Sequence, residues 1–262
     1  MLFKNNELFP IYNKFLHWVK YKKNVVIGDN NYISKKAIIH NNVTIGNNNK
    51  IYDYVEVFPH TTIGDNNYIY PRSHIGDMVI DTKMNDYSYD FSKGKGVSIG
   101  NDNLIHVECV IISGIHNKTV LGNNNKFMGR VLIGHDVKIH DNITIYPACT
   151  IGGSAVLLNH SNIGMGSIVN QNIVIGDYCM IGSCNAVTKN AFPYFITIHN
   201  KIHRLNFKKV PEYILKYEDE LKNIYNDVLR RHKYDSNKYL LDDKIKSTLN
   251  NYFTYSDNKI YT

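Results

Sequence analysis

One corner of this sequence carries a histidine where comparable positions carry simple turn residues. Ile133-Gly134 is followed by His135-Asp136, whereas Ile27-Gly28 is followed by Asp29-Asn30. Imidazole titrates near neutral pH, so an exposed histidine on a fixed turn is suited to general base catalysis. The alternative is an ordinary solvated turn histidine, because the chain has 12 histidines. We take His135 as the candidate base.

A metal site is a second alternative for this corner. His140 follows His135 by five residues, and His116 lies in a nearby insertion. A structural or catalytic zinc ion needs at least three protein ligands, and Ser113, at the matching position of the preceding repeat, is a poor one. We therefore expect no bound metal.

A second group of residues suits the recognition of a sugar and a nucleobase. Residues 78–98 combine polar side chains, Asp81 and Lys83, with the aromatic rings of Tyr87 and Tyr89. The alternative is a surface flap whose aromatic rings pack against a neighbouring coil or subunit.

The elements that position these residues follow from a period of six. Every sixth residue is apolar from Ile27 to Ile75, from Ile99 to Ile111 and from Leu121 to Val187. Glycine, asparagine and aspartate follow many of these positions and tolerate the left-handed backbone of tight corners. Three such hexads close one triangular coil, and stacked coils bury a column of aliphatic side chains. The pattern predicts a mainly β protein, a parallel β-helix of about eight coils.

The β-helix is predicted to span residues 25–205, with outward loops at 78–98 and 112–120 where the period breaks. Insertions in a solenoid have to loop outward, and such loops carry function. Strand edges at both ends of the prism need a cover. Helical spacing of apolar residues predicts a cap in residues 1–24 and a helical region in residues 206–262.

Composition limits the partners. A net charge of +7 and a pI near 9.0 favour anionic molecules such as nucleotides and coenzyme A. No basic helix or aromatic-basic module is present, so we expect no nucleic-acid partner. Charged residues interrupt the apolar positions of residues 1–20, so we expect no signal peptide. No apolar run is long enough to span a bilayer, so we expect no membrane insertion. With 4 scattered cysteines and no zinc-type pairs, the sequence predicts a cytoplasmic protein.

From His135 to Asn200 the chain resembles the UDP-N-acetylglucosamine O-acyltransferases that open lipid A synthesis and the related sugar-nucleotide N-acyltransferases. The matching segments are His135-Asp136, Thr150-Ile151-Gly152-Gly153, Gln171, Ile175-Gly176-Asp177 and Phe192-Pro193-Tyr194. The resemblance implies hexapeptide-repeat coils of left-handed sense, an exception to the usual right-handed crossover. It also implies a homotrimer with sites between adjacent subunits.

The resemblance implies roles for individual residues. His135 would remove the proton from the attacking sugar group, Asp136 would orient it, and Gly153 would offer its N–H to the oxyanion. Asp81 and Lys83 would lie near the acceptor, and Gln171 would line the site. From their charge alone, the basic residues near the end of the prism are expected to meet the phosphates of coenzyme A: Lys189, Lys201 and Arg204.

Departures from the lipid A pattern decide the substrate prediction. Leu132, Ser154 and Asn170 stand where the lipid A enzymes have histidines, and an expected Ile-His-Arg-Gly segment reads Ile112-Ser113-Gly114-Ile115. An amine is a better nucleophile than a hydroxyl and needs fewer supporting groups. The first prediction is an N-acyltransferase that uses acetyl-CoA or a short acyl-CoA and acts on a nucleotide-linked deoxyaminosugar for surface polysaccharide biosynthesis.

Two alternatives stay open. One is the UDP-N-acetylglucosamine 3-O-acyltransferase of lipopolysaccharide biosynthesis, with acyl carrier protein as the donor. The other is a structural or ligand-sensing solenoid in which His135 has no catalytic role. Two irregular loops beside a histidine corner favour an enzyme, because a scaffold gains nothing obvious from them.

Overall fold

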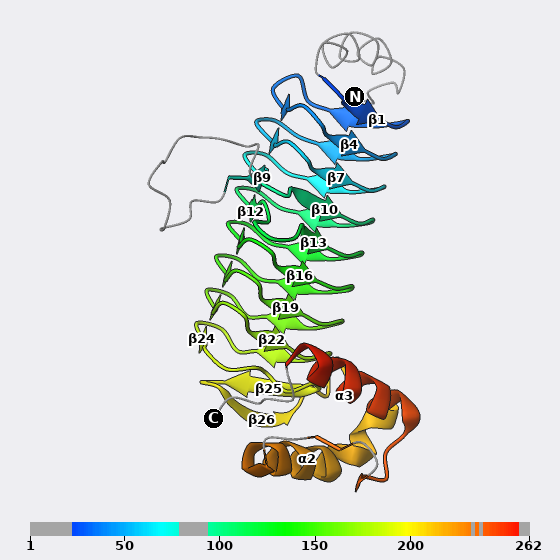
Figure 1. Cartoon of the computed structure of the whole chain (residues 1–262), viewed down its shortest axis with the longest axis vertical. Helices are drawn as coiled ribbons and strands as arrows, with labels where there is room; N and C mark the ends of the chain where they lie inside the picture. The colour runs from blue at the N-terminus through cyan, green and yellow to red at the C-terminus, as the bar shows by residue number, and fades with distance from the viewer. Residues whose placement is uncertain (1–22, 79–93, 232–233, 236–237, 257–262) are drawn as a thin grey trace, which may run out of the picture.

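A computed structural model describes residues 23–78, 94–231, 234–235 and 238–256. These residues form an elongated prism of short strands with helices packed at its C-terminal end (Figure 1). The predicted N-terminal cap lies outside the described residues, apart from its last two positions. The loop residues Asp81, Lys83, Tyr87 and Tyr89 lie outside them as well.

Three sheets form the faces of the prism, and from β1 to β24 each successive strand along the chain joins the next sheet. The first sheet contains β1 (Val26–Ile27), β4 (Thr44–Ile45), β7 (Thr62–Ile63), β10 (Val97–Ile99), β13 (Thr119–Leu121), β16 (Lys138–Ile139), β19 (Val156–Leu157) and β22 (Val174–Ile175). The second contains β2 (Tyr32–Ile33), β5 (Lys50–Ile51), β8 (Tyr68–Ile69), β11 (Leu104–Ile105), β14 (Lys126–Phe127), β17 (Thr144–Ile145), β20 (Asn162–Ile163), β23 (Met180–Ile181), β25 (Phe195–Ile198) and β26 (Lys201–Leu205). The third contains β3 (Ile38–Ile39), β6 (Glu56–Val57), β9 (His74–Asp77), β12 (Val110–Ile112), β15 (Leu132–Ile133), β18 (Thr150–Ile151), β21 (Ile168–Val169) and β24 (Ala186–Val187).

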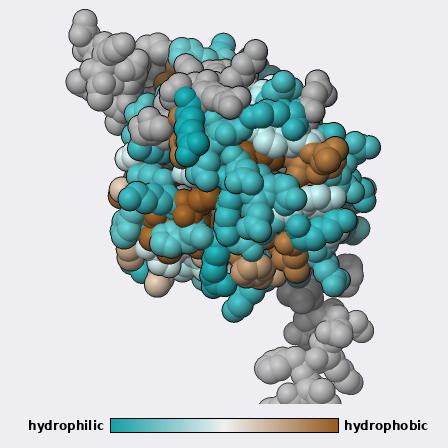
Figure 2. All heavy atoms as spheres, turned by 90° about the horizontal axis from the view of Figure 1, so that it is seen from below, coloured by the Kyte–Doolittle hydropathy of each residue, from teal (hydrophilic) through white to brown (hydrophobic). Residues whose placement is uncertain are grey.

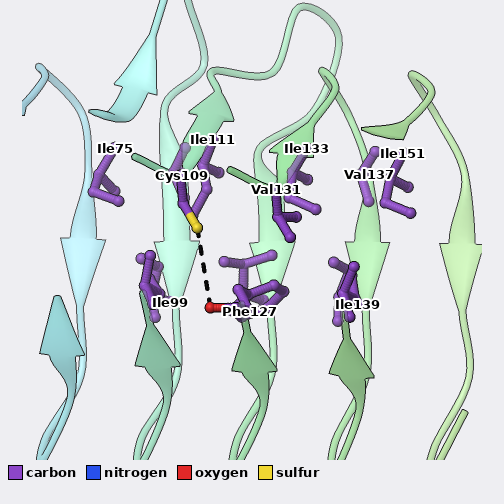
Figure 3. Packing of buried hydrophobic residues seen from close by; sticks show 14 of the residues in the cluster. Ile75, Ile99, Cys109, Ile111, Phe127, Val131, Ile133, Val137, Ile139 and Ile151 are labelled. Atoms are coloured by element: carbon purple, nitrogen blue, oxygen red, sulfur yellow. Dashed lines mark hydrogen bonds between the residues drawn. The ribbon is translucent and has the colours of Figure 1, made fainter. Parts of the chain in front are cut away.

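The aliphatic column predicted from the period of six fills the prism. Parallel pairing sets each key residue beside its equivalent in the next coil, as in Ile111 with Ile133 and Ile133 with Ile151. These side chains point to the same side of their strands in Figure 3, and each is at most 1% exposed. The mainly β solenoid is therefore confirmed, while its left-handed sense stays a prediction.

Two ladders of asparagine and aspartate hold one corner of the prism. On the outside, the Asp29 N–H donates to Asn47 Oδ1 over 2.8 Å, and the Asn47 N–H donates to Asp65 Oδ1 over 2.6 Å. On the inside, buried Asn67 donates its side-chain amide to the Gly100 carbonyl over 2.9 Å. These side chains satisfy main-chain groups that no strand partner can reach at a turn. Asparagine and aspartate thus suit these corners through their hydrogen bonds as well as through their backbone conformation.

A separate hydrophobic core joins the C-terminal elements to the prism. It is built around Phe192 and Phe195 and receives Ile214, Leu221 and Tyr252 from the elements that follow. These elements are a 3-10 helix η3 (Glu212–Tyr217), α2 (Glu218–Arg231) and α3 (Asp243–Tyr255). The predicted C-terminal helices are confirmed, and the first of them begins as a 3-10 helix after Pro211.

The C-terminal end of the prism departs from the simple repeat. β25 pairs in parallel with β23, and β26 then turns back antiparallel to β25. The sequence did not predict this hairpin, because its residues no longer follow the period of six. Viewed from this end, the molecule presents mainly hydrophilic residues with hydrophobic ones in separate patches (Figure 2).

The strands that border the two insertions are described. β10 already begins at Val97, and Ser98 pairs with Thr62, so the first interruption is shorter than the predicted 78–98. The second interruption lies between β12 and β13. Across the described segments, no helix combines the length and apolar character that a bilayer crossing requires.

One buried carboxyl lies where the prism meets the C-terminal core. Asp177 is 5% exposed and accepts a hydrogen bond from the Asn159 side-chain amide over 3.1 Å. Its Oδ2 atom has no hydrogen-bond partner among the described residues. Burial outweighs the hydrogen bonds and raises the pKa of Asp177 to about 6. The folded state therefore holds a proton more tightly than the unfolded chain does.

This pKa predicts that the wild-type free energy of unfolding falls as the pH rises from about 4 to about 6 and stays reduced above it. Asp177→Asn mimics the protonated carboxyl, so it should raise stability at pH 8 by about 2 kcal/mol and change it little below pH 4. Thermal unfolding across this range measures the effect. Asp65→Asn, on the same outer ladder, is the control, and equal gains at pH 4 and pH 8 for Asp177→Asn would contradict the assignment.

Candidate active site

Four of the predicted site residues lie in one column along a corner of the prism. The strand pairs before this corner are Ile133 with Ile151, Ile151 with Val169 and Val169 with Val187. The residues two positions further on therefore follow one another on successive coils: His135, Gly153, Gln171 and Lys189. Neighbouring strands lie about 4.8 Å apart, so the column spans about 14 Å. The solenoid thus aligns residues that are far apart in the sequence.

His135 is held by its neighbour Asp136. The His135 Nδ1 atom lies 2.8 Å from Asp136 Oδ2, and the imidazole side chain is 31% exposed whereas the carboxylate side chain is 5% exposed. An ionised carboxylate only accepts hydrogen bonds, so we assign the proton to Nδ1. Nε2 then keeps its lone pair and can accept a proton from a bound molecule. Asp136 has a φ of 58°, the left-handed conformation that recurs at the corners.

The second insertion stabilises the charge of Asp136. The main-chain N–H groups of Ile115, His116 and Asn117 donate to Asp136 Oδ1 over 3.2, 2.9 and 2.7 Å. Burial by itself would raise the pKa of Asp136, but these amides and the His135 contact outweigh it, and the pKa is lowered. The carboxylate therefore stays ionised beside the imidazole at neutral pH. This use of the insertion was not predicted, because main-chain donors leave no side-chain signal in a sequence.

Gly153 lies directly against the His135 ring. A Cβ atom added to Gly153 would come 2.5 Å from His135 Nε2 and 2.6 Å from Cε1. Only a glycine leaves room for the imidazole at this place. In the described part of the chain the Gly153 N–H donates no hydrogen bond, so it is available to an oxygen that develops negative charge beside His135.

The basic residues predicted to meet phosphates lie at the C-terminal end of the column. Lys189 is half-buried, and Asn200 ties the β25–β26 turn to the adjacent Thr188 through its side-chain amide over 3.1 Å. Lys201 begins β26 beside this turn and is exposed. Arg204 is further along β26, with its guanidinium 5.8 Å from the ring centroid of Phe207. The structure thus brings Lys189 and Lys201 to the same end, while Arg204 stacks on an aromatic neighbour.

An exposed apolar strip runs beside the column. Leu132 is 39% exposed and Ile168 is 56% exposed, on strands β15 and β21 of the third sheet. Thr150 lies between them in register. Ser154 follows Gly153 and Asn170 precedes Gln171, so both flank the column. Leu132, Ser154 and Asn170 therefore add no charged group and no further histidine to the surroundings of His135. The described residues contain no group of three or more His, Cys, Asp or Glu side chains arranged to hold a metal ion.

Comparison with known proteins identifies the repeat. Residues 24–59 match the family model described as bacterial transferase hexapeptide (six repeats). The chain is 33% identical over 126 residues to an acyl-[acyl-carrier-protein]–UDP-N-acetylglucosamine O-acyltransferase of Nautilia profundicola, a match that covers 47% of this chain and 48% of the relative. It is 30% identical over 95 residues to a UDP-3-O-acylglucosamine N-acyltransferase of Bordetella parapertussis, covering 36% of this chain and 26% of the relative.

The fold comparison covers more of the molecule. The UDP-N-acetylglucosamine acyltransferase of Campylobacter jejuni aligns with a TM-score of 0.68 and 24% identity, over 87% of this chain and 86% of that one. At this identity the likeness concerns the fold. By sequence, the matched segment spans about half the length of the Nautilia relative. The sequence matches confirm the predicted resemblance to hexapeptide-repeat acyltransferases, and the structural match confirms the solenoid fold.

The contact between Gly153 and His135 gives a structural prediction. Gly153→Ala should leave the prism intact, because its φ is not left-handed, and should push the imidazole away from its place beside Asp136. A crystal structure of the variant shows the displacement directly. Gly129→Ala is the matched control, since its added Cβ would meet nothing closer than 3.4 Å. An unmoved imidazole in Gly153→Ala would refute the close packing.

Proposed function

We propose that this protein transfers an acyl group from a carrier thioester to a nucleotide-linked sugar, with His135 as the general base. The observation that supports this most strongly is the His135–Asp136 pair, in which the carboxylate holds Nδ1 of a partly exposed imidazole and Nε2 lies beside Gly153. Nε2 takes the proton of the attacking hydroxyl or amine while the nucleophile bonds to the thioester carbon. The Gly153 N–H stabilises the resulting oxyanion. When the carbon–sulfur bond breaks, the imidazolium returns the proton to the leaving thiolate.

The column suggests how the donor lies. Lys189 is at the end of the column about 14 Å from His135, and Lys201 adds a second positive charge beside it. Phosphate on a carrier arm would bind at this end while its thioester reaches Gly153. Gln171, between Gly153 and Lys189, is placed to hydrogen-bond the polar middle of the arm or the sugar.

For the acceptor and donor, we infer UDP-N-acetylglucosamine and acyl carrier protein. The Nautilia relative and the Campylobacter structure are named for O-acylation of, or acyl transfer to, UDP-N-acetylglucosamine, and the Nautilia enzyme is named for its carrier-protein donor. These names favour the alternative derived from the sequence over an acyl-CoA-dependent N-acyltransferase.

N-acylation of a nucleotide-linked deoxyaminosugar is kept as a second candidate. Leu132, Ser154 and Asn170 leave the surroundings of His135 without a further histidine, and an amine needs less assistance than a hydroxyl. In this candidate coenzyme A is the carrier. Asp81, Lys83, Tyr87 and Tyr89 are proposed to contact the acceptor in either case.

We infer a homotrimer in a reducing compartment, the cytoplasm. The exposed strip of Leu132 and Ile168 beside His135 is apolar surface that a neighbouring copy would cover. The thiols of Cys109, Cys149 and Cys179 are free and buried, as expected where disulfides do not form.

The role of His135 is tested by substitution. His135→Ala should lower kcat/KM by about 100-fold or more, the usual contribution of a general base. His160→Asn is the control, because His160 shares the left-handed corner conformation of Asn142, which stands at the matching place one coil earlier, so asparagine fits there. Unchanged turnover in His135→Ala would remove this residue from the mechanism.

The acceptor is tested by giving the purified protein two kinds of nucleotide sugar: UDP-N-acetylglucosamine and a panel of nucleotide-linked deoxyaminosugars. Each is offered acyl carrier protein thioesters and acyl-CoA in turn, and products are identified by mass spectrometry. We expect ester formation on UDP-N-acetylglucosamine with the carrier-protein donor. Amide formation from acyl-CoA would establish the second candidate instead.

Assembly is tested through the exposed strip. Ile168→Lys places a charge on surface that the trimer would bury, so it should shift the species seen by analytical ultracentrifugation from trimer to monomer. Val120→Lys is the control, because Val120 is 37% exposed on a different sheet. A wild-type protein that sediments as a monomer would contradict the trimer.

A further inference from the structure

The two ends of the second insertion meet at a neck, where both are hydrogen-bonded to Gly96. This glycine lies just before β10, at the end of the first insertion. The Gly96 carbonyl accepts the N–H groups of Gly114 and Thr119, each over 3.2 Å, and these residues stand at the two sides of the neck. The Gly96 N–H donates to Ser113 Oγ over 2.9 Å. Lys95 donates its N–H to the Gly114 carbonyl over 2.8 Å. The ends of both insertions are therefore joined by one set of hydrogen bonds.

Glycine is required at both sides of this junction. Gly96 has a φ of 84°, and a Cβ added there would lie 2.1 Å from the carbonyl oxygen of His60. A Cβ on Gly114 would lie 1.6 Å from the carbonyl oxygen of Asn117. The chain after Gly114 folds back so tightly that it tolerates no side chain at that position. This tight bend is what brings three successive N–H groups to one side.

These three N–H groups form an anion-binding concavity around Asp136. Ile115, His116 and Asn117 all donate to Oδ1, and the Ile115 N–H is shared with Oδ2 over 3.3 Å, while Oδ2 also meets His135 Nδ1. Successive main-chain N–H groups arranged in this way bind anions in many proteins. Here the anion is a carboxylate of the same chain. These amides hold the carboxylate with Oδ2 next to the imidazole.

We propose that Gly114 is a positioning residue for His135: its bend aims three main-chain amides at Asp136, and the ionised carboxylate in turn holds the imidazole with its proton on Nδ1. The junction with Gly96 and Ser113 keeps this bend in place. The inference deepens the proposed function and rests on it only in the last step, where Nε2 receives the proton of the acceptor.

The first test needs no substrate. In Gly114→Ala the amides should move off Oδ1, so the buried carboxylate should titrate at least about one pH unit higher than in the wild type. The carbon-13 shift of the Asp136 carboxyl reports this titration, and the nitrogen-15 shifts of the His135 ring report the position of its proton. We expect one tautomer in the wild type and a mixture in Gly114→Ala. Gly129→Ala, a glycine with room for a methyl group, should give wild-type spectra.

Ser113→Ala is the second variant. If Gly114→Ala does not fold, this variant tests whether the junction positions Asp136 and His135. Ser113 is 5% exposed, and alanine removes the acceptor of the Gly96 N–H without adding volume. We expect the same direction of change in the Asp136 titration, at smaller size. Unchanged Asp136 and His135 spectra in the folded variants would overturn the proposal.

Activity then separates this proposal from the proposed function. Gly114→Ala should lower kcat about tenfold with little change in the KM of the acceptor, because the lost interaction acts on the proton transfer and not on binding. Altered spectra with an unchanged kcat would overturn the positioning role. A wild-type protein that transfers no acyl group to any nucleotide sugar would instead refute the proposed function, and the spectra would still decide whether Gly114 fixes the pair.

Discussion

The stacking of one aliphatic side chain on its equivalent in the next coil is the constraint from which the other features follow. Ile111, Ile133 and Ile151 touch in this way, and a slip of one residue would turn an apolar side chain outward and a polar one into the column. The key residues therefore keep their register from coil to coil, and the shift where β12 pairs with β9 comes only after Ile111. The repeat length then decides which residues are neighbours in space on successive coils.

This register explains how a solenoid built of two-residue strands can hold reactive side chains in place. His135, Gly153, Gln171 and Lys189 come from separate turns, yet the parallel pairs before them put them in line. At the asparagine-lined corner, side chains of asparagine and aspartate hold the main chain through hydrogen bonds. Where the repeat is interrupted, the extra residues support the corner, as the amides on Asp136 illustrate.

Much of this could be predicted from the sequence, and the limits have physical reasons. The spacing of Ile27, Ile33 and their successors predicts the sheets, and the Ser113 position one coil before His135 agrees with the pairing of Ile111 and Ile133. The β25–β26 hairpin was missed because antiparallel pairing at an end obeys no repeat. The role of residues 115–117 was missed because they act through main-chain N–H groups, which every residue but proline carries. The predicted acceptor residues of the first insertion lie outside the described residues and stay predictions.

The central claim is that the rigid corner presents Nε2 of His135 to the nucleophile of a bound nucleotide sugar. It is tested most directly by a crystal structure of the protein with UDP-N-acetylglucosamine and a donor analogue that cannot react. The account predicts the nucleophilic atom within about 3.2 Å of Nε2, and the analogue's carbonyl oxygen within hydrogen-bonding distance of the Gly153 N–H. A sugar bound with its nucleophile against a different group, and with His135 facing only solvent, would contradict it.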